Sequence, residues 1–298
     1  MKIEVKKISE FVWEIPKTSE MLVPGRIYAD RATIEPLITE LERIKAGGFM
    51  PALQQVANVA TLPGIQKASL AMADIHPGYG FPIGGVAAFD ADNGVISVAG
   101  VGFDINCGVR VLKTPLVRDD IEPKKVELAN QLFRDIPSGV GSTGDIRLKE
   151  REIDELLIKG ARFIVEQGYG TRDDLEYTEE GGEIKGADPD SVSKRAKERQ
   201  FKQIGTLGSG NHYLEVQWVE EVFDREAADA YGIFKDQILI AIHCGSRGLG
   251  HQIGTDYLKV LEEASRKYNI PIRDRELVCA PCKSPEGRQY LKAVYCGI

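Results

Sequence analysis

The pattern of hydrophobic and polar residues predicts a series of short strands. Strands are expected at residues 13–16, 109–113, 213–219 and 237–243, the last being an almost unbroken apolar run. Residues 84–98 are expected to form a hairpin, because apolar runs flank Asp92-Asn93-Gly94 and Asn-Gly is a strong turn signal. A further turn is expected at Pro24-Gly25.

Helical spacing of apolar residues predicts helices between these strands. The expected ranges are 35–45, 123–134, 150–167 and 250–267. Asp188-Pro189 is predicted to open another helix, because Asp is favoured at the N-cap and Pro at the first helical position. The charged stretch 172–199 is expected to be a solvated flap.

The order of these elements indicates the fold class. Strands and helices are interleaved without a regular βαβ period, which favours an α+β fold with mixed sheets and flanking helices. Because no linker stands out, we expect a single domain over residues 1–298.

Composition narrows the class of protein. The chain has 298 residues, of which 43% are hydrophobic and 28% charged, as is typical of globular proteins. Its apolar runs are too short to cross a membrane and its start has no signal-peptide pattern. Five cysteines are too few for a disulfide scaffold, so a cytoplasmic location is expected. The net charge of −7 argues against nucleic-acid binding over the whole surface, but a local basic groove remains compatible with it.

Residues 100–110 carry the strongest chemical signal. They read GVGFDINCGVR, so a carboxylate and a thiol lie three positions apart among glycines that offer little to a core. A buried Asp104 needs a compensating cation, and Asp104 with Cys107 offers a hard and a soft donor. The alternative for Cys107 is a small apolar core residue.

Two histidines lie in similar surroundings. His212 follows the glycine-rich residues 208–211, and His243 ends the apolar run of the last predicted strand. Either histidine is a candidate metal ligand, although His243 also fits a core position. In a regular strand His212 and Glu215 would point to opposite faces, so a bend is needed if both are to approach one site.

Other segments give weaker signals. Arg247 lies among glycines where the last helix begins, an arrangement suited to binding phosphate, and residues 137–142 form a second glycine-rich loop. Asp74 and His76 are candidates for acid–base or substrate contacts, or for turn capping. Cys279 and Cys282 resemble half a zinc site, but no second pair follows them.

Several of these motifs together resemble the RtcB family of RNA-splicing ligases. The resemblance runs from about Trp13 to the end of the sequence and rests on the following blocks: LPGI at 62–65, HPGYGFPIGG at 76–85, GFDINCGVR at 102–110, GSGNH at 208–212 and HCGSRGLG at 243–250.

The resemblance implies a function and a site. It implies an α+β ligase that joins a 2′,3′-cyclic phosphate or 3′-phosphate RNA end to a 5′-hydroxyl end, using GTP and two manganese ions. Cys107 would bridge both metals. Asp104 and His212 would complete the protein ligands of one metal, and His243 would be a ligand of the other. The nucleotide would lie beside Asn211, His212 and Glu215, Arg247 would hold an RNA phosphate, and Asp74 would border the site. The implied partners are tRNA exon halves and an archease-type activator.

The sequence also departs from this family. Family members continue past the position of Ile298, and that portion carries a third metal-binding histidine, the histidine that accepts GMP and most of the guanine pocket. We therefore expect this chain alone to form no covalent guanylate, and a separate C-terminal portion is a candidate partner. A catalytically incomplete metal-binding fragment and a dinuclear metal phosphoesterase remain as alternatives. The donor set also suits zinc, iron or cobalt.

Overall fold

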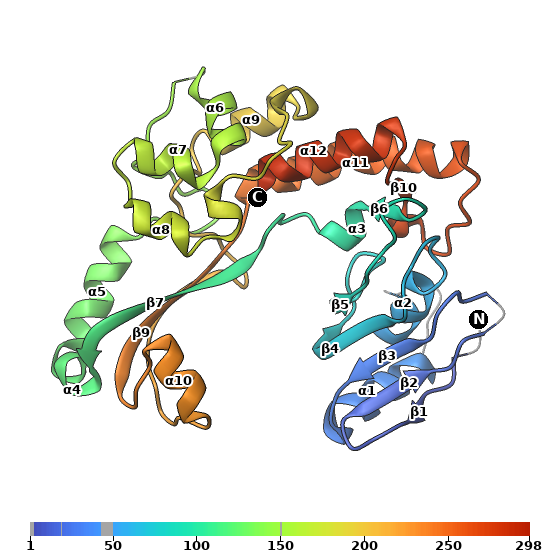
Figure 1. The fold of residues 1–298 in the computed structure, drawn as a ribbon, viewed down its shortest axis with the longest axis horizontal. Helices are drawn as coiled ribbons and strands as arrows, with labels where there is room; N and C mark the ends of the chain where they lie inside the picture. Colours follow the sequence, from blue (N-terminus) through green and yellow to red (C-terminus); the bar gives the residue numbers. More distant parts are fainter. Residues whose placement is uncertain (1–2, 19, 43–49, 150) are drawn as a thin grey trace. The chain divides into compact units, whose positions relative to one another are not determined.

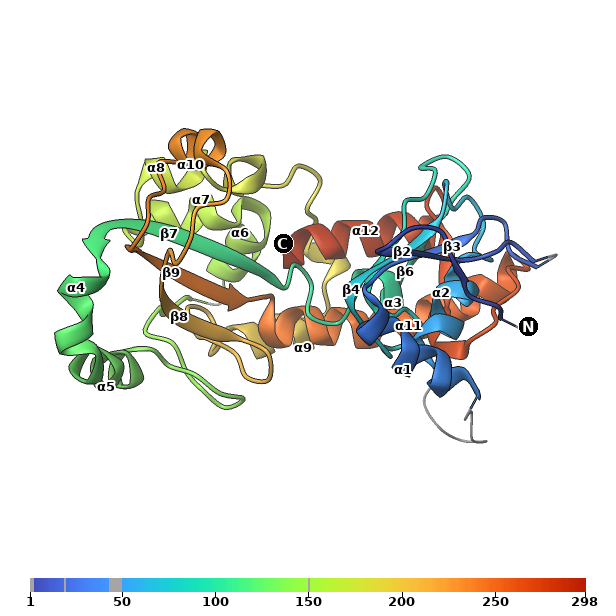
Figure 2. The same ribbon diagram turned by 90° about the horizontal axis from the view of Figure 1, so that it is seen from below.

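The computed structural model describes residues 3–18, 20–42, 50–149 and 151–298. Its mixture of sheets and helices confirms the predicted α+β class (Figures 1 and 2). The chain divides into two compact units: unit 1 comprises residues 1–103 and 254–293, and unit 2 comprises residues 104–253 and 294–298. The single domain expected from the sequence stays a prediction. No helix in the described ranges has the length and apolar character that a membrane span requires.

Unit 1 contains a five-stranded sheet in the order β1-β2-β3-β4-β5. Its strands are β1 (Lys6–Lys7), β2 (Val12–Ile15), β3 (Gly25–Tyr28), β4 (Ser69–His76) and β5 (Ile83–Val86). β3 and β4 run parallel and the other pairs antiparallel. The strand expected at 13–16 is confirmed as β2. The turn expected at Pro24-Gly25 is wrong, because Gly25 begins β3 opposite Ile15, where a side chain would collide with Val56.

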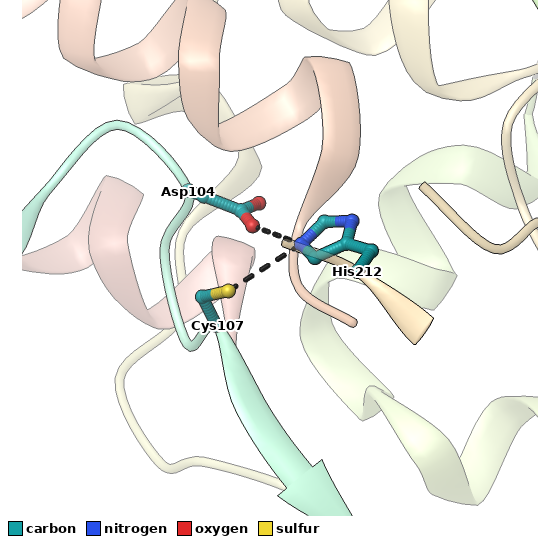
Figure 3. A group of neighbouring side chains, drawn as sticks. All are labelled: Asp104, Cys107 and His212. Atoms are coloured by element: carbon teal, nitrogen blue, oxygen red, sulfur yellow. Dashed lines mark hydrogen bonds and ion pairs between the residues drawn. The ribbon is translucent and has the colours of Figure 1, made fainter. Parts of the chain in front are cut away.

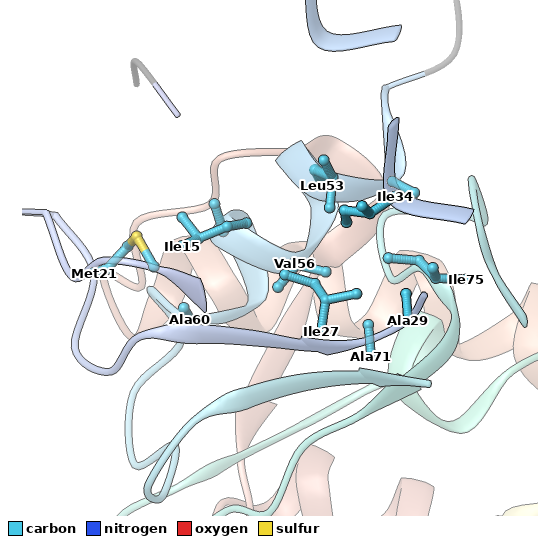
Figure 4. Packing of buried hydrophobic residues seen from close by; sticks show 12 residues of the cluster. Ile15, Met21, Ile27, Ala29, Ile34, Leu53, Val56, Ala60, Ala71 and Ile75 are labelled. Carbon is cyan, nitrogen blue, oxygen red and sulfur yellow. The ribbon is translucent and has the colours of Figure 1, made fainter. Parts of the chain in front are cut away.

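Two helices cover this sheet with apolar side chains. α1 (Arg31–Glu42) begins four residues before the predicted helix, and the end predicted at 43–45 lies outside the described residues. α2 (Ala52–Val59) is buried along almost its whole length. Ile34 of α1 and Val56 of α2 pack with Ile27 of β3 in a core of fully buried residues (Figure 4).

The hairpin predicted at 84–98 is wrong. The turn exists, since Oδ1 of Asp90 accepts hydrogen bonds from the backbone N–H groups of Asp92 and Asn93. The strands on either side of it do not pair with each other. β5 pairs with β4, whereas β6 (Val95–Ser97) pairs with β10 (Cys279–Pro281). Val95 and Cys279 share a second apolar cluster, and burial of that cluster outweighs the local turn signal.

Unit 2 is built on a three-stranded antiparallel sheet with β9 (Gln237–Cys244) between β7 (Gly108–Val117) and β8 (Tyr213–Trp218) (Figure 1). All three strands were predicted from the sequence. β7 extends beyond its predicted end, with an irregularity between Lys113 and Val117. Pro115 lies there and has no N–H for the ladder, which an edge strand tolerates.

Short helices surround this sheet. They are α4 (Arg118–Ile121), η1 (Glu122–Lys124), α5 (Lys125–Asp135), α6 (Glu152–Lys159), α7 (Ala161–Glu166), α8 (Arg172–Glu176), η2 (Glu179–Gly182), η3 (Pro189–Ser191), α9 (Lys194–Gln200) and α10 (Arg225–Tyr231). The helix predicted at 123–134 is confirmed as η1 and α5. The helix predicted at 150–167 is divided, because Gly160 has a φ of +56° and ends α6. Residue 150 itself lies outside the described residues.

The segment predicted as a solvated flap is folded. It contains α8, η2, η3 and most of α9, and it buries Val192 and Ala196. Asp188 caps only the short η3 helix, by accepting a hydrogen bond from the Asp190 N–H, and Ser193 caps α9 instead. The flap predicted from the polar composition is therefore wrong, because a few buried apolar residues pack this segment against the rest of unit 2.

Two longer helices complete the chain. α11 (Arg247–Lys267) confirms the helix predicted at 250–267 and begins three residues earlier. α12 (Pro285–Gly297) follows β10, and η4 (Arg275–Leu277) and α3 (Val98–Val101) are short helices of unit 1. The first turns of α11 belong to unit 2, where they adjoin the site described next.

Candidate metal centre

The central strand of the unit 2 sheet positions His243. In the register of the sheet His243 lies opposite Val109 of β7 and Tyr213 of β8, so these three side chains share one face. The rings of Tyr213 and His243 meet edge to face, with centroids 5.2 Å apart. Pairing on both sides of β9 therefore fixes the direction of this imidazole.

A tight turn before β7 presents Asp104 and Cys107 together. The Cys107 N–H donates a hydrogen bond to the Asp104 carbonyl oxygen, at 3.1 Å. Asn106 within this turn has a φ of +56°, a conformation that Asn tolerates better than most residues. Both side chains point toward His212 (Figure 3).

His212 reaches the same place from the loop before β8. It precedes the first strand residue, so it is not bound by the alternation that would separate it from Glu215. Its side chain is only 6% exposed. A Cβ atom on Gly208 would lie 1.7 Å from Nδ1 of His212, so only glycine leaves space for this ring.

The donor atoms converge on the Cys107 sulfur. Its Sγ atom lies 3.4 Å from Nε2 of His212 and 3.2 Å from Nε2 of His243. His212 Nε2 also lies 2.6 Å from Oδ2 of Asp104. The ligand atoms of Asp104, Cys107 and His212 all lie within 4.8 Å of one another.

These distances suit a divalent ion. Around tetrahedral zinc, sulfur and nitrogen ligands are separated by roughly 3.5 Å, given bonds of about 2.3 and 2.0 Å. The two sulfur–nitrogen distances are close to this value. The contact of 2.6 Å between His212 and Asp104 has the length of a hydrogen bond. These two atoms must separate by roughly 0.7 Å to share a tetrahedral ion. The sulfur lies within 3.4 Å of both imidazoles, so it is placed to share an ion with either of them.

The metal-free thiol is held in its protonated form. Burial raises the pKa of the Cys107 thiol to about 12, and the hydrogen bond and negative charge of Asp104 add to this effect, followed by the charge of Cys244. Thiolates, and not thiols, bind metals. A bound cation would therefore have to displace the proton of Cys107.

Asp104 has further partners that the sequence did not reveal. Its Oδ1 atom accepts hydrogen bonds from the Arg247 N–H at 3.2 Å and from Ser246 Oγ at 3.4 Å. Its carboxylate thus lies at the N-terminal end of α11, which favours negative charge. A Cβ atom on Gly245 would lie 2.6 Å from Oδ2 of Asp104. The only sequence signal for these contacts was the density of glycine beside Ser246.

The other predicted site residues have different surroundings. Arg247 donates from Nε to Thr206 Oγ1 at 3.3 Å and from Nη2 to the Gly139 carbonyl at 3.0 Å. Asn211 is exposed in the loop that carries His212. Glu215 is exposed, accepts a hydrogen bond from Gln217, and shares the face of Tyr213 and His243 because it lies opposite Ala241.

Asp74 belongs to unit 1. It lies on β4, where a Cβ atom on Gly84 would fall 2.4 Å from its Oδ1 atom, and its carbonyl oxygen lies 2.7 Å from Nδ1 of His76. Its expected place beside the metal ligands stays a prediction.

Known proteins match most of this chain. The family model described as tRNA-splicing ligase RtcB matches residues 55–298. Proteins named tRNA-splicing ligase RtcB from Thermococcus kodakarensis and Methanococcus maripaludis are each 52% identical, over 98% and 100% of this chain. One from Archaeoglobus fulgidus is 51% identical over 96% of it. The chain spans 58–60% of the length of these relatives. These matches show that the chain belongs to the RtcB family.

Proposed function

We propose that this chain forms the metal-binding part of an RNA ligase that acts in tRNA splicing and RNA repair. The ligase joins a 2′,3′-cyclic phosphate or 3′-phosphate end to a 5′-hydroxyl end, with GTP and manganese as cofactors. The observation that carries the proposal is the convergence of His212 and His243 on the sulfur of Cys107, with Asp104 beside them. The names of the relatives support the reaction class.

The residues divide between two ions and the substrates. Asp104, Cys107 and His212 would hold one ion, and Cys107 and His243 would hold the other. Two ions, when bound, neutralise the attacking and leaving oxygens of a phosphoryl displacement. The protein side chains hold the ions and align the RNA ends.

Further residues are assigned to the nucleotide and the RNA. Glu215 and Asn211 border the nucleotide, and the shared face of Glu215 and His243 supports this role. Arg247 is assigned to an RNA phosphate, and its backbone N–H bond to Asp104 supports this role because it places Arg247 beside the proposed ligands. Asp74 is assigned to the border of the site, as the resemblance implies.

The proposed partners are tRNA exon halves, an archease-type activator and a separate C-terminal portion. The proposed location is the cytoplasm, which agrees with the five free cysteines of the chain.

Metal analysis and an end-joining assay test the proposal. We expect the purified chain to bind two manganese ions, and Cys107→Ser to bind fewer. Joining of a 3′-phosphate RNA to a 5′-hydroxyl RNA should need GTP and should appear only after addition of the C-terminal portion of a relative, because this chain alone is expected to form no covalent guanylate. Phosphate release without GTP would support a phosphoesterase. Two ions without turnover under either condition would support a metal-binding fragment.

A further inference from the structure

A row of cations lies along α9 and the turn that follows it. Residues 194–202 hold five Lys or Arg and a single Glu, in a chain whose net charge is −7. Arg195, Arg199 and Lys202 are spaced as i, i+4 and i+7, and all three are exposed. The Ile204 N–H donates to the Gln200 carbonyl oxygen, so helical spacing continues past the end of α9. The three cations therefore share one side.

The acidic residues nearby are engaged with other cations. Glu198 pairs with Lys194 at 3.9 Å, and Asp154 pairs with Lys197 at 2.7 Å. In the described part of the chain, Arg195, Arg199 and Lys202 form no ion pair with a carboxylate. The positive charge of this row is therefore left for a ligand.

The middle residue of the row lies against the first turns of α11. Arg199 donates from Nη1 to Oε1 of Gln252 on α11, at 3.1 Å. Its side chain also crosses Gly248, where a Cβ atom would lie 3.2 Å from Nε of Arg199. Gly248 is the neighbour of Arg247, whose N–H contacts Asp104. A chain of direct contacts thus joins the cation row to a metal ligand.

Backbone hydrogen bonds join the end of the row to a neighbouring segment. The Gly144 N–H donates to the Lys202 carbonyl, and the Gly139 N–H donates to the Gly208 carbonyl, each at 3.0 Å. Gln203 links this pair to α11, because its Oε1 atom accepts the Gly248 N–H at 2.8 Å. The segment 139–144 therefore connects Lys202, at the end of the row, with Gly208, in the loop that carries His212.

We propose that Arg195, Arg199 and Lys202 form a track for the phosphate backbone of single-stranded RNA leading to the metal centre. The proposal rests on the proposed function and names the surface that receives the RNA. Along an α-helix, spacings of four and three residues correspond to about 6 and 4.5 Å. Cations at these intervals can each face a different phosphate of one strand. An acidic protein surface does not present its negative charges in such a regular series.

The variant Arg195→Gln/Lys202→Gln tests the track. Arg199 is left unchanged because its contacts support α11. The control is Lys124→Gln/Lys235→Gln, which removes the same charge from two exposed positions of unit 2. Affinity of the 298-residue chain for a fluorescein-labelled single-stranded RNA with a 3′-phosphate is measured by anisotropy over a salt series.

We expect the track variant to raise Kd roughly 10-fold at low salt, and to reduce the slope of log K against log salt by about 1.4 for two lost contacts. The control should match the unsubstituted chain, and both variants should bind manganese equally well. Equal effects of the two variants, or no RNA binding by the unsubstituted chain, would overturn the proposal. Competition by polyglutamate as strong as by unlabelled RNA would also overturn it. Because manganese binding is measured separately, failure of the track is distinguishable from failure of the proposed metal centre.

Discussion

Gly208 lies directly against the ring of His212, and a methyl group on Gly208 would fall 1.7 Å from Nδ1. Gly208→Ala should therefore displace the imidazole while leaving every donor residue in the chain. We expect manganese affinity to fall at least about tenfold, since loss of one ligand contact costs over about 1.4 kcal/mol. Gly141→Ala is the matched control, because the space around Gly141 is open and its φ is not positive. Equal manganese affinity of the two variants would refute the steric role of Gly208.

Cys107→Ser should lower the bound manganese from two ions to one or none. The hydroxyl group is a poor bridging ligand, because it is hardly ionised at neutral pH. Metal analysis after gel filtration measures the effect. Cys244→Ser is the control, since the Cys244 sulfur contacts the Thr206 carbonyl at 3.6 Å. Full occupancy in Cys107→Ser would remove the basis of the proposed bridge.

Metal binding should release a proton from Cys107. Because burial and then Asp104 raise the pKa of this thiol to about 12, the metal-free group is protonated throughout the neutral range. The apparent affinity for manganese should thus rise about tenfold per pH unit over the pH range in which the ion has to displace this proton. Calorimetric titration at pH near 8 in two buffers of different ionisation enthalpy counts the released protons. A count near zero would contradict the thiolate ligand.

Arg247→Ala should weaken RNA binding and leave the ions in place. The substitution removes the guanidinium group but keeps the backbone N–H that contacts Asp104. Loss of one charged phosphate contact is expected to raise Kd for RNA about tenfold or more, since such bonds contribute about 1.5–3 kcal/mol. Anisotropy and metal analysis of the same preparation separate the two effects. The side chain also bonds Gly139, so circular dichroism must confirm an unchanged fold.

Ile27→Ala should destabilise unit 1. Ile27 is completely buried between Ile34 and Val56, so truncation leaves a cavity in the core. The expected loss is about 2–5 kcal/mol in the free energy of unfolding, measured by urea denaturation. Ile83→Ala is the control, because Ile83 is 46% exposed on β5 and should lose about 1 kcal/mol or less.

The sequence predicted elements whose signals are local. The strands at 213–219 and 237–243 formed as expected, because alternation and a continuous apolar run each reflect burial of the strand itself. The hairpin at 84–98 failed because β6 finds its partner at Cys279–Pro281, far away in the sequence. No local pattern encodes that pairing. The division of the helix at Gly160 was readable in principle, since glycine ends helices readily.

The sequence predicted the candidate metal ligands, but not the residues that form hydrogen bonds to them. The spacing of Asp104 and Cys107 and the glycine-rich surroundings of His212 and His243 predicted that these side chains lie together, and the structure brings them together. The hydrogen bonds from Ser246 and Arg247 to Asp104 were missed, because they join residues 142 and 143 positions apart. Spacing along the chain carries no information about such contacts. The roles of the metal-ligand candidates stay predictions, as do those of Arg247, Asn211, Glu215 and Asp74.

The donors that meet at Cys107 come from segments 105 and 136 residues away in the sequence. An ion held there would act as a cross-link between three distant stretches of polypeptide. Loading should slow hydrogen–deuterium exchange at the Gly108 end of β7 and the Cys244 end of β9, while leaving the opposite ends unchanged. Ion occupancy would then govern the rigidity of the proposed RNA track, as well as the proposed chemistry at the metal centre.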